Sequence, residues 1–375
     1  MDEFCKVKSS NLSPVFTLAR TTESGRRGRL ETAHGTIETP FFLPVGTAGA
    51  VRGLTQRDLH DLQAQVLLCN TYHLHLHPGE EVIAAAGGLH TFIDWQKPIL
   101  TDSGGYQVFS LRGLRKISDH GVEFRSHADG NKHFLGPQEA VQIQHQLGSD
   151  IIMCFDECPP STASHREIEQ AVDRTLRWAR ICKTTHEKLQ TSGRNSSLLF
   201  GIIQGGLESD LRKKCAEELI AIGFDGYAIG GLAVGESEEE MLEVLREVVP
   251  LLPPDQPRYL MGVGVREQLK KCVTLGIDMF DCVLPMRIAR HGTILLSDGS
   301  DLRITNTKFK DAHIPIDPDS PSDLSRMHMR SYLHHLFRVH ERYAETIACK
   351  QNLGVTLAMM SDLRNDLDQN KTENT

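Results

Sequence analysis

A short apolar run opens the stretch Pro98-Ile-Leu-Thr-Asp-Ser-Gly-Gly-Tyr-Gln-Val-Phe109 and ends at Asp102. A run that is apolar on consecutive residues, and not on alternate ones, is typical of a strand covered on both faces. Eight β-type runs, most of them of this kind, follow one another along the chain. They are Phe41–Val45, Val66–Asn70, Pro98–Asp102, Asp150–Glu157, Leu198–Gln204, Gly226–Gly231, Tyr259–Gly264 and Gly276–Val283.

Helical patterns fill most of the gaps between these runs. The clearest of them begin near residues 55, 136, 164, 209 and 237. Strands that alternate with helices in this way predict an α/β protein, a (β/α)8 TIM barrel. A doubly wound open sheet is the alternative arrangement of the same elements.

Three segments lie outside this repeat. Residues 14–40 predict an antiparallel hairpin, and residues 113–135 predict a second hairpin, inserted after strand three with a tight turn at Asp129-Gly130. Beyond strand eight come a turn at Asp298-Gly299 and helices from about residue 326 to residue 363. We therefore assign 14–291 to the barrel, 292–363 to a C-terminal helical subdomain of the same domain, and 364–375 to a polar, frayed tail.

The composition is that of a soluble globular enzyme, with 39% hydrophobic and 24% charged residues in a chain of 375. The longest apolar runs, of about eight residues, are too short to span a membrane. The N-terminus carries acids where a signal peptide needs an apolar core, so we expect a cytoplasmic protein. The nine cysteines are scattered and form no C-x-x-C, which predicts free thiols.

The net charge of −8 does not suggest a nucleic-acid binder, yet residues 287–342 hold nine Lys/Arg against seven Asp/Glu. A modestly basic segment on an acidic body fits phosphate binding, and it fits a solvated surface of mixed charge equally well. Arg287 and Arg290 follow strand eight directly, where they are either phosphate contacts or a solvated exit from the strand.

Two carboxylates, Asp102 and Asp281, close strands three and eight. In a barrel of parallel strands, side chains at this end converge on a substrate. One carboxylate as nucleophile and another as proton carrier suit retaining glycosyl transfer at a sugar carbon. The other strand ends bring Ser103, Asp156, Gln204, Gly230, Gly231 and Met261. This set of donors and acceptors suits the edge of a purine-like base, although any single acid among them fits a helix cap or an ion pair as well.

Ordered motifs over residues 14–363 resemble the bacterial type of tRNA-guanine transglycosylase, the queuine tRNA-ribosyltransferase. The matching stretches are Thr101-Asp-Ser-Gly-Gly-Tyr-Gln-Val-Phe-Ser110, Asn70-Thr-Tyr-His-Leu74, Phe155-Asp-Glu-Cys-Pro159, Gly201-Ile-Ile-Gln-Gly-Gly206, Gly230-Gly-Leu-Ala-Val-Gly-Glu236, Tyr259-Leu-Met-Gly-Val-Gly264 and Phe280-Asp-Cys-Val-Leu-Pro285.

The resemblance implies a TIM-barrel enzyme that exchanges the wobble guanine of G-U-N anticodon tRNAs for a free 7-deazaguanine base. It implies that Asp281 attacks the ribose and that Asp102 handles the proton of the bases. By the same resemblance, the remaining site residues divide between base and tRNA. The base would meet Ser103, Asp156, Gln204 and the backbone of Gly230, Gly231 and Leu232, between Tyr106 and Met261, and the anticodon loop would meet Arg287 and Arg290. The family's homodimer is a candidate assembly.

Val234 and Cys158 stand at the pocket positions as in the bacterial type, which favours 7-aminomethyl-7-deazaguanine over the bulkier queuine. The resemblance also implies a structural zinc held by three cysteines and a histidine. Those positions read Ser320, Ser322, Ser325 and Gln351 here, so we expect no zinc in a degenerate zinc-type subdomain and no other cofactor.

Two other functions stay open from the sequence. One is a non-catalytic tRNA-binding partner subunit, which the presence of both Asp102 and Asp281 disfavours. The other is a retaining glycosidase on a small substrate, which Gln204 and the basic C-terminal third make less natural.

Overall fold

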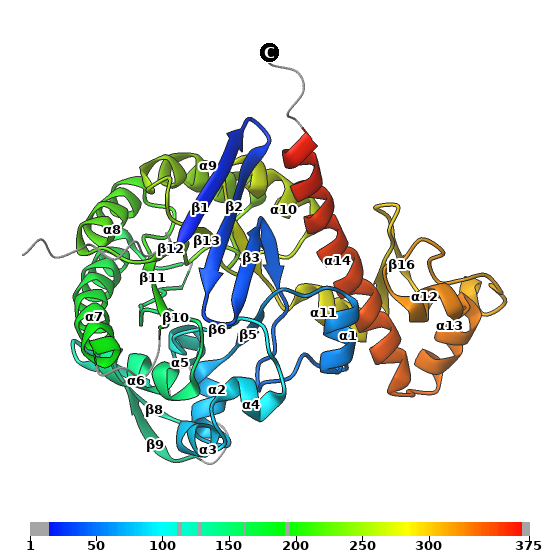
Figure 1. The fold of residues 1–375 in the computed structure, drawn as a ribbon, viewed down its shortest axis with the longest axis horizontal. Coiled ribbons are helices and arrows are strands. Elements are labelled where there is room, and N and C mark those ends of the chain that lie inside the picture. Colours follow the sequence, from blue (N-terminus) through cyan, green and yellow to red (C-terminus); the bar gives the residue numbers. More distant parts are fainter. Residues whose placement is uncertain (1–14, 111–114, 127–129, 161, 192–195, 370–375) are drawn as a thin grey trace, which may run out of the picture.

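The computed structural model describes residues 15–110, 115–126, 130–160, 162–191 and 196–369. Its centre is a sheet of parallel strands in the order β4-β14-β13-β12-β11-β10-β6-β5, and a parallel bridge between Val45 and Leu68 joins the two ends of that order (Figure 1). The sheet therefore closes into a barrel, which confirms the (β/α)8 prediction against the open sheet. The strands are β4 (Phe41–Leu43), β5 (Leu67–Cys69), β6 (Ile99–Thr101), β10 (Ile151–Met153), β11 (Leu198–Ile203), β12 (Gly226–Ile229), β13 (Arg258–Leu260) and β14 (Met279–Asp281).

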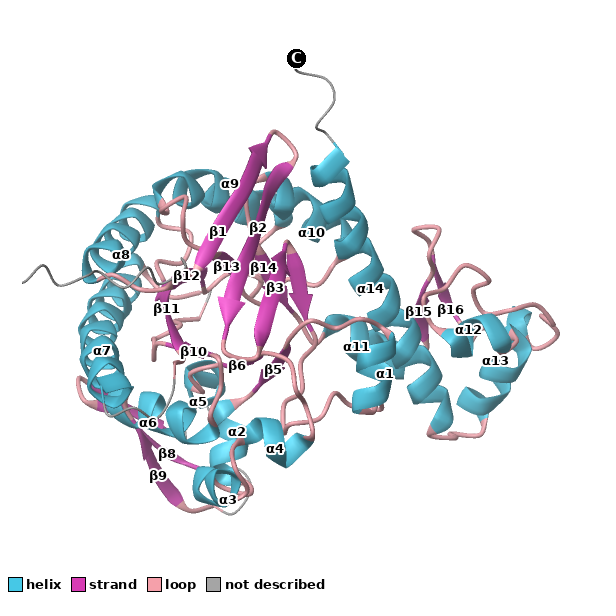
Figure 2. Cartoon of the chain, in the orientation of Figure 1, coloured by secondary structure: helices cyan, strands magenta, loops and turns pink. Residues whose placement is uncertain are grey.

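Helices surround the barrel, as Figure 2 shows, and several have clear start signals. Thr55 before α1 (Gln56–Asp61) and Ser237 before α9 (Glu238–Val248) each form a capping box. Pro137 opens α6 (Pro137–Leu147). The other helices of this layer are α2 (Thr71–Leu76), α3 (Glu80–Ala85), α4 (Leu89–Ile93), α5 (Gly105–Ser110), α7 (His165–Thr191), α8 (Ser209–Ile222), the 3-10 turn η1 (Val249–Leu251), α10 (Arg266–Thr274) and α11 (Leu284–Arg290).

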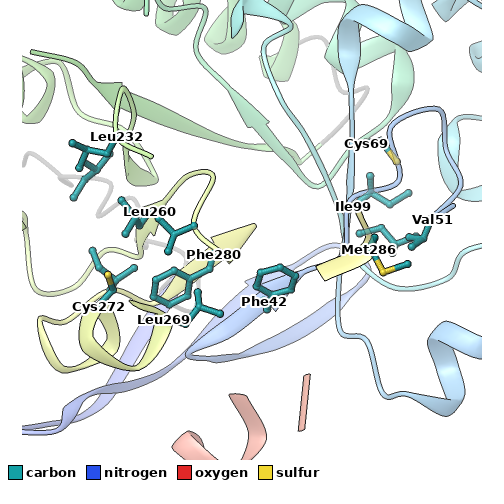
Figure 3. Close-up of a cluster of buried hydrophobic side chains, with 14 of the residues drawn as sticks. Phe42, Val51, Cys69, Ile99, Leu232, Leu260, Leu269, Cys272, Phe280 and Met286 are labelled. Atoms are coloured by element: carbon teal, nitrogen blue, oxygen red, sulfur yellow. The ribbon is translucent and has the colours of Figure 1, made fainter. Parts of the chain in front are cut away.

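The barrel strands bury side chains on both faces. Alternate residues, such as Phe41, Leu100 and Met279, fill the barrel interior in one cluster. The residues between them pack outward against the helices, and Figure 3 shows Leu260 and Phe280 beside Leu269 and Cys272 of α10. Two buried faces explain why these strands read as continuous apolar runs.

An antiparallel sheet covers the N-terminal end of the barrel, where its Phe16, Leu30 and Ile37 join the interior cluster. The sheet has three strands, β1 (Phe16–Thr22), β2 (Gly25–Thr32) and β3 (Gly35–Thr39), and β2 lies between the two strands that the sequence predicted. The predicted antiparallel element is confirmed, but its central strand was missed. The strand β2 was missed because its arginines look like surface residues in the local sequence. Their partners lie far along the chain, as the carbonyl oxygens of Pro254 and Gln256 do for Arg26.

The insertion after strand three is also antiparallel, as predicted, and it too has a third strand. It comprises β7 (Arg115–Ser118), β8 (Gly121–Arg125) and β9 (Lys132–Leu135). The predicted turn at Asp129-Gly130 falls partly outside the described residues, since Asp129 is not among them.

The C-terminal segment forms a small unit at the side of the barrel (Figures 1 and 2). The hairpin β15 (Thr293–Leu295) and β16 (Asp301–Arg303) turns at the predicted Asp298-Gly299 pair. It is followed by η2 (Thr307–Phe309), α12 (Asp323–Met327), α13 (Arg330–Arg338) and α14 (Tyr343–Gln369). Helix α14 packs against α11, α12, α13 and β15, and also against β2 and β4.

The start of the frayed tail was predicted too early, at residue 364. Helix α14 continues through Gln369, and residues 370–375 lie outside the described residues. Local polarity suggested fraying, but tertiary contacts order the last turns. Leu367 is buried, Arg364 donates a hydrogen bond to the carbonyl oxygen of Pro40, and Arg20 donates one to that of Leu367.

The cysteines that the structure describes are free, as predicted, and Cys5 is not among them. In the described part of the chain, no helix combines the length and the apolar character needed to cross a bilayer.

Candidate active site

A pocket of about 410 Å³ opens at the C-terminal ends of the barrel strands. Except for Arg290, every site residue predicted from the sequence lines it. The predicted residues in the lining are Asp102, Ser103, Tyr106, Asp156, Cys158, Gln204, Gly230, Gly231, Leu232, Val234, Met261, Asp281 and Arg287. The barrel thus brings together residues that are up to 185 positions apart (102 to 287).

Asp281 ends β14 and is held through one of its two oxygens. The Tyr259 hydroxyl donates a hydrogen bond of 2.6 Å to Oδ1, and the backbone N–H of Gly262 donates one of 3.1 Å to the same atom. Burial raises the pKa of the Asp281 carboxyl, and these two bonds partly offset the rise. Because both go to Oδ1, Oδ2 remains without a hydrogen bond from the described residues, as an attacking oxygen requires.

Asp102 follows β6 and accepts more hydrogen bonds. The backbone N–H groups of Thr71 and Gly104 donate to Oδ1 at 2.9 and 3.1 Å, and the side-chain amide of Asn70 donates to Oδ2. The pKa of Asp102 is nevertheless raised to about 7, first because burial opposes ionisation and also because the charge of Asp281 is near. A carboxyl group that titrates near neutral pH can both give and take a proton.

Asp156 and Gln204 form a polar floor between the ends of β10 and β11. The Gln204 amide nitrogen donates to Asp156 Oδ2 at 2.7 Å, and the Ser103 hydroxyl donates to Oδ1 at 3.4 Å. Burial raises the pKa of Asp156 to about 6. The Gln204 Oε1 atom is buried and has no hydrogen-bond partner among the described residues, so it remains available to a ligand.

The loop after β12 approaches this floor closely. A Cβ atom at Gly231 would lie 2.5 Å from Gln204 Oε1, and Gly231 also has a φ of +66°, so the position requires glycine. The buried Arg212 of α8 donates to the carbonyl oxygens of Ile203 and Gly230 at 2.9 and 2.7 Å. Arg212 therefore fixes the backbone that carries Leu232 and Val234.

The pocket rim carries Tyr106, which is 58% exposed, and the exposed Arg287. Arg290 lies on the same helix, α11, but does not line the pocket. Its guanidinium donates back to the carbonyl oxygen of Met286 at 3.0 Å. The two arginines that the sequence predicted as a pair are therefore placed differently.

The chain is similar to known proteins along nearly its full length. The family model described as queuine tRNA-ribosyltransferase matches residues 21–375. The chain belongs to the queuine tRNA-ribosyltransferase family. Curated relatives that carry the name queuine tRNA-ribosyltransferase include proteins of Halothermothrix orenii, Solidesulfovibrio magneticus and Acinetobacter baylyi. They are 51%, 48% and 49% identical to this chain, over 90%, 94% and 96% of its length and 89%, 94% and 92% of theirs.

Three residues that support the site of this queuine tRNA-ribosyltransferase family member were not predicted from the sequence. Tyr259 and Asn70 hold the two aspartates, and Arg212 holds the glycine loop. Tyr259 and Asn70 stand inside the quoted motifs, which is the signal that could have found them. Arg212 lies in the charged helix stretch Ser209-Asp-Leu-Arg-Lys-Lys214 and carries no local signal.

Proposed function

We propose that this chain exchanges the wobble guanine of G-U-N anticodon tRNAs for a 7-deazaguanine base through a covalent Asp281–ribose intermediate. The observation that carries the proposal is the pair of half-buried carboxylates in one pocket, of which Asp281 has an Oδ2 without a hydrogen bond from the described residues and Asp102 has a pKa of about 7. Membership of the queuine tRNA-ribosyltransferase family supports the substrate class.

The first displacement forms a bond between Asp281 Oδ2 and the ribose carbon C1′. The bond from C1′ to the guanine N9 breaks, and its electron pair goes to the base. Protonated Asp102 gives its proton to the departing guanine, so a neutral base leaves and Asp102 becomes ionised.

The second displacement reverses these transfers with a new base. Ionised Asp102 takes the N9 proton of the 7-deazaguanine, N9 bonds to C1′, and the bond to Asp281 breaks. Because one glycosidic bond replaces another, the exchange needs no cofactor or external free energy.

The polar floor of the pocket suits recognition of the base. The Gln204 Oε1 atom can accept a hydrogen bond from a base N–H, and the Asp156 carboxyl has the two-oxygen edge that a guanidine-like N–H pair requires. Tyr106 and Met261 would flank the ring, and the Gly230–Leu232 backbone would meet its remaining edge.

The incoming base that we favour is 7-aminomethyl-7-deazaguanine. A second cavity of about 300 Å³ adjoins the pocket, and Gln204, Gly231 and Val234 line both. Glu208, Glu236 and Glu240 line the second cavity, which suits a cationic amine on the arm of the base. Queuine carries an amine at the same place, so the preference for the smaller base rests on Val234, whose side chain narrows the passage. Replacing Val234 by glycine would widen the passage and raise the relative rate with queuine.

The tRNA would contact Arg287 at the rim and Arg290 beyond it. We keep the cytoplasm as the expected location, since the proposed substrate is a tRNA. We keep the homodimer as a candidate assembly, to be tested by the mass of the protein in solution. A non-catalytic partner subunit or a glycosidase on a small substrate would have no use for this pairing of carboxylates with a base-binding floor.

The test is release of labelled guanine from the wobble position of a G-U-N tRNA, with 7-aminomethyl-7-deazaguanine and queuine supplied in parallel reactions. A tRNA with adenine at the wobble position is the matched control. We expect release with both free bases, faster with the aminomethyl base, and none from the control. Retained tRNA binding without release would instead indicate a partner subunit, and cleavage of a free glycoside would indicate a glycosidase.

A further inference from the structure

We propose that the C-terminal unit, residues 292–363, is held together without zinc by a buried hydrogen-bond cluster at the positions where the resemblance implies zinc ligands. The cluster joins Ser320, Gln351, Asp317 and Ser297, and a buried lysine beside it links the same segments by ion pairs. This proposal concerns folding and does not depend on the reaction.

The side chains at the four implied ligand positions do not suit zinc. Zinc is bound in proteins by thiolates, imidazoles and carboxylates, whereas Ser320, Ser322, Ser325 and Gln351 offer three hydroxyls and an amide, all neutral at pH 7. Groups of three or more His, Cys, Asp or Glu close enough to share a metal ion occur elsewhere among the described residues. None of them falls within 292–363, a range that the structure describes throughout.

Gln351 on α14 is fully buried, and both ends of its amide are used. Its Oε1 atom accepts a hydrogen bond of 2.5 Å from the Ser320 hydroxyl. Its Nε2 atom donates to the carbonyl oxygen of Leu295 at 2.7 Å and to Asp317 Oδ2 at 2.8 Å. One side chain thereby connects β15, the 317–320 loop and α14, which is the cross-link that a metal would otherwise supply.

Asp317 extends the cluster to the hairpin turn. Its Oδ2 atom also accepts the backbone N–H and the hydroxyl of Ser297 at 2.9 and 2.7 Å. The next residue on α14, Asn352, donates to the carbonyl oxygens of Pro285 and Thr293 at 3.0 Å each. The hairpin is therefore tied to α14 at several successive points.

Lys350 supplies the ionic part of the link. Its side chain is only 4% exposed, and its Nζ atom lies 2.8 Å from Asp58 of α1 and 2.9 Å from Asp323 of α12. These pairs connect α14 to the barrel layer on one side and to the Ser322–Ser325 turn on the other.

The remaining two serines contribute nothing comparable. The hydroxyls of Ser322 and Ser325 are buried, and neither has a hydrogen-bond partner in this fully described part of the chain. A buried, unpartnered hydroxyl destabilises a fold, so removing it is neutral or favourable. Ser322 and Ser320 are thus matched positions in one loop with opposite expected effects.

The first experiment measures the zinc content of the purified chain and its melting temperature with and without a chelator. We expect no stoichiometric zinc and no shift with the chelator. One bound zinc whose removal lowers the melting temperature would overturn the proposal, and this measurement needs no variant to fold.

The second experiment compares Ser320→Ala and Gln351→Leu with Ser322→Ala and Ser325→Ala. The first two should lower the melting temperature, by about 5 °C for Gln351→Leu, and the last two should leave it unchanged or raise it. An equal fall in melting temperature in Ser320→Ala and Ser322→Ala would overturn the proposed cluster.

The third experiment restores the donors with Ser320→Cys, Ser322→Cys, Ser325→Cys and Gln351→His together. This variant should take up one zinc ion, and its melting temperature should fall when a chelator removes that ion. Failure of this folded variant to take up zinc would show that the four positions are not arranged around one point, which would overturn the proposal that the cluster occupies the implied zinc site.

Discussion

The barrel pocket and the C-terminal unit both bury polar side chains, but with opposite consequences for stability. In the pocket, burial raises the pKa values of Asp102, Asp156 and Asp281. An acid whose pKa is higher in the folded chain than in the unfolded one binds its proton more tightly when folded. The stability that such an acid contributes is therefore lost as the pH rises from its pKa in the unfolded chain through its pKa in the folded chain. At pH 8 these carboxylates consequently destabilise the fold.

In the C-terminal unit, Ser320, Gln351 and Asp317 satisfy one another and stabilise the fold. In the pocket, the charged form of each carboxylate is disfavoured by burial. In the C-terminal unit, the Asp317 carboxylate accepts hydrogen bonds from Gln351 and Ser297, and Lys350 is paired with Asp58 and Asp323. Substitutions in the two regions should therefore separate activity from stability.

The largest effect is expected from Asp281→Asn. Without an anionic nucleophile, exchange should fall on the order of 10⁴-fold or more. The melting temperature at pH 8 should not fall, because a neutral side chain replaces a half-buried charge whose pKa is raised by desolvation. Guanine release and thermal unfolding on the same preparation check both statements. Exchange within about tenfold of the unaltered chain would exclude Asp281 as the nucleophile.

Asp102→Asn should lower exchange by about 10²–10⁴-fold, because a positioned proton carrier contributes that much. In the unaltered chain, kcat/KM should decline above pH 7 as Asp102 loses its proton, and at low pH as Asp281 gains one. The measurement is the pH profile of both chains. The Asp102→Asn variant should lack the decline of kcat/KM above pH 7. If the decline were unchanged in the variant, a group other than Asp102 would be its cause.

Tyr259→Phe should reduce kcat/KM by about tenfold, since it removes one hydrogen bond to a charged group. That bond lowers the pKa of Asp281, so its loss should shift the acid limb of the profile to higher pH. Tyr227→Phe is the matched control, because Tyr227 is equally buried but does not line the pocket. An unshifted acid limb in Tyr259→Phe would remove the positioning role.

The smallest expected effect is that of a zinc chelator on exchange, which should be none. The exchange rate is measured before and after chelation and dialysis. A loss of rate that added zinc restores would show that the two regions are coupled through a metal.

Much of this fold was predictable because parallel strands buried on both faces leave consecutive apolar residues in the sequence. The polar residues that end those runs, Asp102, Gln204 and Asp281 among them, fall at one end of the barrel for the same reason. Pairing across distant sequence was not predictable. Tyr259 looks like a core aromatic until Asp281 is placed beside it, and Arg212 looks like a surface charge until the Gly230 carbonyl faces it.

The same limit explains the missed strand β2 and the early end given to α14. Each is charged or polar locally and is ordered by partners from the other end of the chain, as Arg27 with Asp368 illustrates. The loss of the implied zinc ligands was visible in the sequence, whereas the cluster around Gln351 depends on contacts between three separated segments.

The most direct test is guanine exchange on a G-U-N tRNA by a preparation whose zinc content is measured in the same tube. We expect exchange that depends on Asp281, by protein that contains no stoichiometric zinc. Exchange that requires bound zinc would rule out a zinc-free C-terminal unit, and tRNA binding without any exchange would rule out the enzymatic function.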